Sequence, residues 1–385
     1  MDINDFEKYK SYEEQPCTDD TRWDYFSKED KKRAKSRFSR YFAAVAAFLL
    51  ISNLVAIITE VVLIFALGAE RAAAIADNYI YIWTMNVVAM YVVAFPIFLL
   101  IVRPMSNTVR SKRKLTVKEF FELLFVSFAF MFIGSTVGTY INSFVSKLLG
   151  RESVDLTSDL IISSPWWLIL IVAVVIGPII EEVMFRKLLM DKLGMYGDRI
   201  AIVISAVAFG IFHGNISQIC YATLVGLILA YIYSKTSKIT YCIGLHMLLN
   251  FFGSIVPIAL LEPMDRYYEI LDVIANGGQY DTMEFEKLSI IVGAYSSAVL
   301  VIVALGVYIL FKKIRNVFVS DRCEISIPRH KRFGIILLNS GAFLFIILTL
   351  ATILLNIFSA PLIEESINSD SILLNIGSIY ERCNF

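Results

Sequence analysis

The 385-residue chain has little charge: Asp, Glu, Lys and Arg make up 18% of it, whereas 57% of its residues are hydrophobic. Such a composition excludes an ordinary water-soluble globule and predicts an all-α, multi-pass membrane protein. Basic and acidic residues balance at 35 each, so no net charge favours nucleic acid as a partner. The first twenty residues are polar and acidic, so we expect no cleavable signal peptide.

Several motifs of well-known hydrolases are also missing. There is no HExxH zinc motif and no Gly-x-Ser-x-Gly elbow. Gly197-Asp198 lies in a hydrophilic loop, which argues against an aspartyl enzyme. The five cysteines show no CxxC spacing, and Cys220 and Cys242 lie in apolar segments, so we interpret these two as small hydrophobic residues. Only two residues follow Cys383, so the chain is not expected to be prenylated itself.

Long hydrophobic runs are abundant. A helix needs about 20 residues to cross the bilayer, and nine stretches reach or approach that length. The loops that carry Lys and Arg (103–118, 187–199, 235–238 and 312–332) all fall on the side of the basic segment 31–40. The positive-inside rule therefore predicts a cytoplasmic N-terminus. The predicted spans, eight or nine in number, are 41–67, 79–102, 120–146, 165–190, 199–213, 216–233, 239–261, 288–312 and 333–357.

Two features predict irregular helices. The fifth and sixth stretches are short and meet at Gly214-Asn215, which indicates a hairpin that turns inside the membrane, where non-helical backbone needs protein or water around it. Gly177-Pro178 predicts a kink, because proline removes a helical hydrogen bond.

The kink precedes a pair of carboxylates, Glu181 and Glu182, with Arg186 one helical turn further on. A charge at the centre of a membrane helix costs about 2.5–3.5 kcal/mol, so several together indicate function. The alternative is that they lie at a helix end, in the interface, where the cost is small. Because Glu182 and Arg186 are four residues apart, they are expected to pair and to leave Glu181 free.

The chain has three histidines. His330 lies in a basic loop and is interpreted as a surface residue. His213 and His246 lie in apolar helical segments, where a lone histidine is more often a packing group than a catalyst. Phe209 precedes His213 by four residues and Asn250 follows His246 by four, so each pair shares a helix face.

Together these residues suit the attack of water on an amide. Glu181 and His213 would activate the water, and His246 with Asn250 would donate hydrogen bonds to the developing oxyanion. A zinc site made of Glu181, His213 and His246 is the alternative, since one Glu and two His form a known ligand set. The residues leave open whether the enzyme uses no cofactor or zinc.

The sequences EEVMFR (181–186), FGIFH (209–213) and HMLLN (246–250) resemble the EExxxR, FxxxH and HxxxN/D motifs of the CAAX prenyl protease and bacteriocin-processing (Abi) family of intramembrane peptidases. The resemblance covers about 165–255. It implies that Glu181 is the general base beside His213, that His246 and Asn250 form the oxyanion hole, and that Glu182 and Arg186 support the geometry. The family is described both as glutamate-type and as metallopeptidase. The implied layout is a polar basic tail (1–40), N-terminal membrane helices (41–147), a CAAX-protease-like core (160–262), C-terminal membrane helices (288–358) and a polar tail (359–385).

The leading hypothesis is a multi-pass endopeptidase of the cell membrane. Its partners would be the lipid bilayer and a membrane-associated peptide or protein: a prenylated C-terminus, a leader peptide or a membrane segment. One rival is a non-catalytic protein of the same fold, such as an immunity factor that binds a peptide toxin. Another is a transporter that uses the same polar residues as an ion path.

Overall fold

The computed structural model describes residues 26–108, 113–153, 155–313 and 323–359. The predicted C-terminal tail, most of the predicted N-terminal tail, and the loop residues Arg110, Lys112, Arg315 and Arg322 lie outside these ranges. Within them the protein is an all-helical bundle, as predicted, with eight helices long and apolar enough to cross a membrane.

The helical elements follow one another closely along the chain. In order they are α2 (Lys28–Leu67), α3 (Ala69–Ala76), α4 (Tyr79–Asn86), η2 (Val87–Ala94), α5 (Phe95–Val102), α6 (Val117–Leu148), α7 (Leu156–Ser163), α8 (Trp166–Ile169), η3 (Leu170–Ile176), α9 (Gly177–Glu182), η4 (Val183–Leu188), α10 (Leu189–Leu193), η5 (Gly194–Tyr196), α11 (Asp198–Phe212), α12 (Ile216–Thr236), α13 (Ile239–Asn250), η6 (Phe251–Ile255), α14 (Val256–Ala275), α15 (Thr282–Lys313), α16 (Arg329–Ile336) and α17 (Ser340–Ser359).

Two predicted boundaries differ from the structure. The Ser27 side chain caps α2 through a capping box with Asp30, so the helix begins at Lys28. The basic segment 31–40 is thus the first part of a 40-residue helix, not a separate tail. The predicted span 199–213 forms α11, which at 15 residues is shorter than a membrane-spanning helix, so the described residues hold eight candidate spans, the lower of the two numbers predicted.

Prolines widen the helices without interrupting them. The elements η2, η3 and η6 are π-helical, and each ends just before an α-helix whose second residue is proline: Pro96, Pro178 or Pro257. Proline has no N–H, and its ring clashes with the carbonyl four residues earlier. A wider turn avoids this clash because its hydrogen bonds reach the carbonyl five residues back. The bonds that close these turns run from Phe95 to Met90, from Gly177 to Val172 and from Val256 to Phe251.

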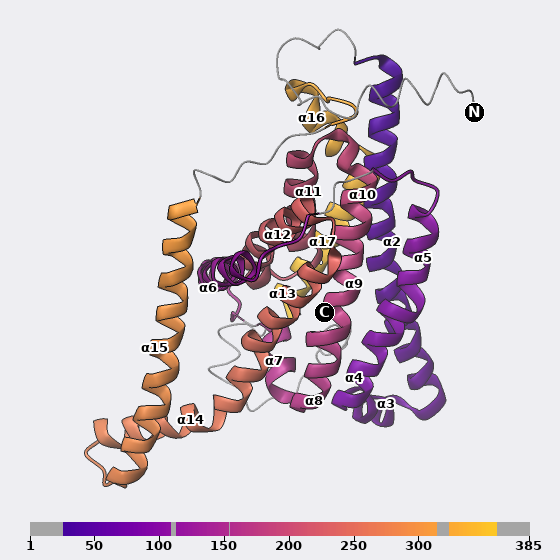
Figure 1. The fold of residues 1–385 in the computed structure, drawn as a ribbon. Coiled ribbons are helices and arrows are strands. Elements are labelled where there is room, and N and C mark those ends of the chain that lie inside the picture. The colour runs from indigo at the N-terminus through magenta and orange to yellow at the C-terminus, as the bar shows by residue number, and fades with distance from the viewer. Residues whose placement is uncertain (1–25, 109–112, 154, 314–322, 360–385) are drawn as a thin grey trace.

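The helices around the candidate site form the centre of the bundle (Figure 1). α12 packs against α11 on one side and α6 on the other, α13 packs against α9, and α2 packs against η2, α5 and α17. Glycines permit the closest approach: a Cβ atom on Gly138 of α6 would lie 2.3 Å from the Ser217 carbonyl oxygen of α12. Small residues let membrane helices pack this tightly.

Two glycine turns set the level of the site. Gly197 (φ 121°) reverses the chain between η5 and α11, and Gly214 (φ 61°) reverses it between α11 and α12. Glu181 precedes Gly197 by as many residues as His213 follows it. The helical segments on the two sides of Gly197 run in opposite directions, so Glu181 and His213 lie at the same height along the bundle. Glu181 lies at the midpoint of the candidate span Trp166–Tyr196, whereas the predicted span 165–190 placed it toward the cytoplasmic end.

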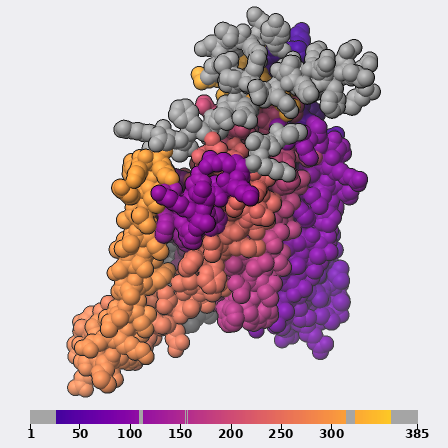
Figure 2. All heavy atoms as spheres, in the orientation of Figure 1, coloured from indigo at the N-terminus to yellow at the C-terminus, as the bar shows by residue number. Residues whose placement is uncertain are grey.

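Large apolar side chains cover much of the outer surface. Phe65, Leu100, Phe144 and Ile290 are all more than 60% exposed. Such a surface suits a lipid environment and would be a liability in water. The α14–α15 hairpin extends outward beyond the rest of the body (Figure 2).

Candidate active site

Glu182 and Arg186 form a buried ion pair, as predicted from their spacing. Arg186 Nε lies 3.1 Å from Glu182 Oε2, and both side chains are 0% exposed. The pair crosses from α9 into the π-helical η4. Each side chain therefore gives the other an opposite charge at a place that water does not reach.

The α11 face supports Arg186. Ser205, Phe209 and His213 recur every four residues on this face, and the Arg186 guanidinium lies over the Phe209 ring at 4.5 Å from its centroid. Arg186 also donates from Nη1 to Ser205 Oγ at 3.3 Å, and Ser205 Oγ donates to the Phe185 carbonyl at 2.7 Å. The arginine is therefore fixed by charge, by an aromatic face and by a hydroxyl.

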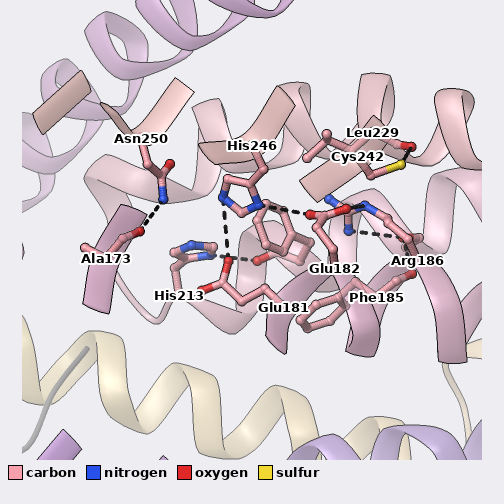
Figure 3. A network of polar contacts seen from close by, with 12 residues as sticks. Ala173, Glu181, Glu182, Phe185, Arg186, His213, Leu229, Cys242, His246 and Asn250 are labelled. Atoms are coloured by element: carbon pink, nitrogen blue, oxygen red, sulfur yellow. Dashed lines mark hydrogen bonds and ion pairs between the residues drawn. The ribbon is translucent and has the colours of Figure 1, made fainter. Parts of the chain in front are cut away.

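His246 lies between the two carboxylates (Figure 3). Its Nδ1 is 3.0 Å from Glu182 Oε1, and its Nε2 is 3.7 Å from Glu181 Oε2. A carboxylate accepts hydrogen bonds, so the contact with Glu182 places a hydrogen on Nδ1. The Nε2 atom therefore faces Glu181.

His213 follows α11 directly and is half-buried. Its Nδ1 lies 2.8 Å from the Phe209 carbonyl oxygen, which can only accept, so Nδ1 carries the hydrogen. In the neutral ring this leaves the Nε2 lone pair available. The ring stands edge-on to Phe209 at a centroid distance of 4.9 Å and lies beside Glu181 in Figure 3. Phe209 thus buttresses both His213 and Arg186.

Glu181 is the accessible member of the pair. Its side chain is 20% exposed, while that of Glu182 is 0% exposed. It points toward the two imidazoles (Figure 3). The structure therefore brings Glu181, His213 and His246 together from three helices.

Asn250 lies farther along α13, and its amide donates to the Ala173 carbonyl of η3 at 2.9 Å. Among the side-chain hydrogen bonds of the described residues, none joins Asn250 to Glu181, His213 or His246. Its nitrogen has a second hydrogen, which this contact does not use.

We tested whether the residues fit the zinc alternative. Within the described ranges, no three His, Cys, Asp or Glu side chains are grouped so that they could hold a metal ion. Glu181, His213 and His246 therefore do not present a formed ligand set for zinc. Cys220 and Cys242 are free thiols, as predicted, and Cys242 Sγ donates to the Leu229 carbonyl at 3.4 Å.

Some supporting residues were not found from the sequence. Tyr41 of α2 donates from its hydroxyl to the Met184 carbonyl of η4 at 2.5 Å, and Asn356 of α17 donates to the Gly214 carbonyl at 2.9 Å. Both come from helices far away in the chain, so no spacing indicates them. Ser205 could have been found, because it continues the four-residue repeat of Phe209 and His213.

Comparison with known proteins gives the class of this site. Residues 163–252 match the family model for type II CAAX prenyl endopeptidase Rce1-like proteins. The predicted resemblance is thus confirmed over the segment that carries all three motifs. The chain is also 27% identical over 212 residues to the protein named "Putative membrane peptidase YdiL" of Bacillus subtilis (strain 168). The aligned region covers 54% of this chain and 84% of that protein. No solved structure matches. These findings support a membrane protease.

Proposed function

We propose that the protein is an intramembrane endopeptidase that hydrolyses a peptide bond of a membrane-associated peptide or protein. The observation that carries this proposal is the contrast between two adjacent glutamates. Arg186 neutralises the fully buried Glu182, whereas Glu181 is accessible and faces two imidazoles. A free carboxylate beside imidazoles in a water-poor site suits a general base.

The hydrolysis proceeds by direct attack of water. Glu181 takes a proton from the water while the lone pair of His213 Nε2 orients it, and the oxygen bonds to the scissile carbonyl carbon. The resulting oxyanion receives hydrogen bonds from His246 and Asn250. When the C–N bond breaks, the proton held by Glu181 passes to the leaving amine, so the products are a carboxylic acid terminus, which then gives up its proton to water, and an amine.

His246 can donate to the oxyanion in only one of its protonation forms. Its Nδ1 hydrogen is directed to Glu182, so it donates to an oxyanion from Nε2 only when both ring nitrogens carry hydrogen. Two carboxylates, those of Glu181 and Glu182, face this ring, and Arg186 pairs with Glu182. The proposed catalytic residues are therefore Glu181, His213, His246 and Asn250, supported by Glu182, Arg186 and Phe209. The placement of basic loops supports a cytoplasmic N-terminus.

The test compares membranes that contain the wild type or Glu181→Gln at equal level, with Glu286→Gln at an exposed position as a matched control. Peptides are identified by mass spectrometry. We expect cleavage products with the wild type and Glu286→Gln, and a loss of about 10²–10⁴-fold with Glu181→Gln, since a general base contributes that much. Undiminished products with Glu181→Gln would refute the proposal. Ion flux in proteoliposomes without products would favour a transporter, and an unchanged toxin-binding phenotype would favour the immunity factor.

A further inference from the structure

Tyr91 belongs to η2, and none of the three motifs contains it. A Cβ atom built on Gly177 would lie 3.4 Å from the Tyr91 hydroxyl oxygen and 3.9 Å from Glu181 Oε1. Because both distances start from the same point, one small group placed there can contact the Tyr91 hydroxyl and the Glu181 carboxylate together. Tyr91 also lies outside the segment 163–252 that matches the family model.

The position of the Tyr91 ring is fixed. It packs on a buried apolar cluster formed by Trp83 of α4 with Leu168, Ile169 and Val172. Its hydroxyl is different, because no hydrogen bond of this group is found among the described residues. A tyrosine hydroxyl normally finds a partner, so an unused donor next to a candidate base suits a group that binds there.

The other donors of the site are partly committed. Asn250 directs one amide hydrogen to the Ala173 carbonyl, and His246 directs its Nδ1 hydrogen to Glu182. Tyr91 offers a hydrogen that no protein acceptor in the described ranges takes. Gly177 leaves the space between this donor and Glu181 open, since it has no side chain to fill it.

We propose that Tyr91 is a further catalytic residue, whose hydroxyl donates a hydrogen bond to the scissile carbonyl oxygen as it becomes an oxyanion. The inference rests on the proposed function. No proton leaves the phenol: the water proton goes to Glu181 and then to the amine, and the Tyr91 hydrogen bond shortens as negative charge develops on the carbonyl oxygen. Donors of this kind act mainly in the transition state, so their loss lowers kcat more than it raises KM.

The test uses purified full-length protein in lipid nanodiscs and a library of acyl-anchored peptides with a fluorophore and a quencher. Removal of one oxyanion donor costs about 10²–10³-fold in kcat in known cases. We expect Tyr91→Phe to lose about 10-fold or more in kcat, with KM and melting temperature near the wild type. Tyr140→Phe, which removes the hydroxyl of a tyrosine that is 74% exposed, should lose nothing. Replacement of Tyr91 by 3-fluorotyrosine, which is nearly the same size and a stronger donor, should raise kcat, which a packing role would not explain.

A second variant tests the open space. Gly177→Ala places a methyl group between the two oxygens and should lower kcat, whereas Gly244→Ala, whose added methyl meets nothing within 4 Å, should not. If the wild type cleaves, Glu181→Gln does not and Tyr91→Phe keeps full kcat, the inference is overturned and the proposed function stands. If the wild type cleaves no peptide of the library, or Glu181→Gln cleaves as well as the wild type, the proposed function fails and the inference with it.

Discussion

At the residue scale, the protein gives two adjacent glutamates opposite environments. Glu182 points into the protein toward Arg186 and His246, and Glu181, about 100° further round the helix, faces the accessible side of the site. One carboxylate is therefore structural and the other is free for chemistry. The sequence allowed this division to be predicted, because only Glu182 has an arginine four residues later.

This division predicts that the two glutamates differ in stability measurements. Glu182→Gln leaves Arg186 buried without its counter-charge, and breaking such a pair costs about 3–5 kcal/mol. We expect a large drop in melting temperature in detergent for Glu182→Gln and a small change for Glu181→Gln. The double variant Glu182→Leu/Arg186→Met should regain stability relative to Glu182→Gln, because no charge is left unpaired. Equal melting temperatures for the two single glutamine variants would contradict the assignment.

At the element scale, the apolar runs predict most of the helices, but not their internal geometry. The kink at Gly177-Pro178 stays a prediction, and the structure adds that the helix continues there through a π-helical turn. The end of the fourth span was placed at 190, but the helical run continues to Tyr196, which moves Glu181 to its midpoint. The equal spacing of Glu181 and His213 from Gly197 could have indicated that the two residues lie at the same height along the bundle. The π-helical turns could not be predicted, because the sequence does not say which backbone N–H each carbonyl near a proline will accept from.

Close packing of α11 on α12 holds His213 in place, which gives a prediction about Gly210. A Cβ atom there would lie 2.0 Å from Thr223 Oγ1 and 2.8 Å from the Ile219 carbonyl oxygen. Overpacking of this kind costs about 1–3 kcal/mol. Gly210→Ala should therefore melt at a lower temperature and lose activity, while Gly293→Ala, with nothing within 4 Å of the added methyl, should be as stable as the wild type or more so. A Gly210→Ala protein as stable as Gly293→Ala would show that the helices do not meet this closely.

At the scale of the whole molecule, helices outside the matched segment complete the site. Tyr41 of α2 binds the η4 backbone next to the glutamates, Asn356 of α17 binds the turn after His213, and Tyr91 of η2 faces Glu181. The three motifs predicted that Glu181, His213 and His246 lie together, and they carried the resemblance. These outer residues could not be predicted, since their positions depend on packing between helices that are far apart in the chain.

The central claim is that Glu181 and His213, held by two antiparallel helices, act on one water molecule. The most direct test is a double-mutant cycle on single-turnover cleavage with Glu181→Gln, His213→Asn and the double variant. We expect each single change to lose about 10²–10⁴-fold and the double variant to lose little more than the worse single one, because residues that act as a unit are not additive. Losses that multiply in the double variant, or full cleavage by either single variant, would contradict the account.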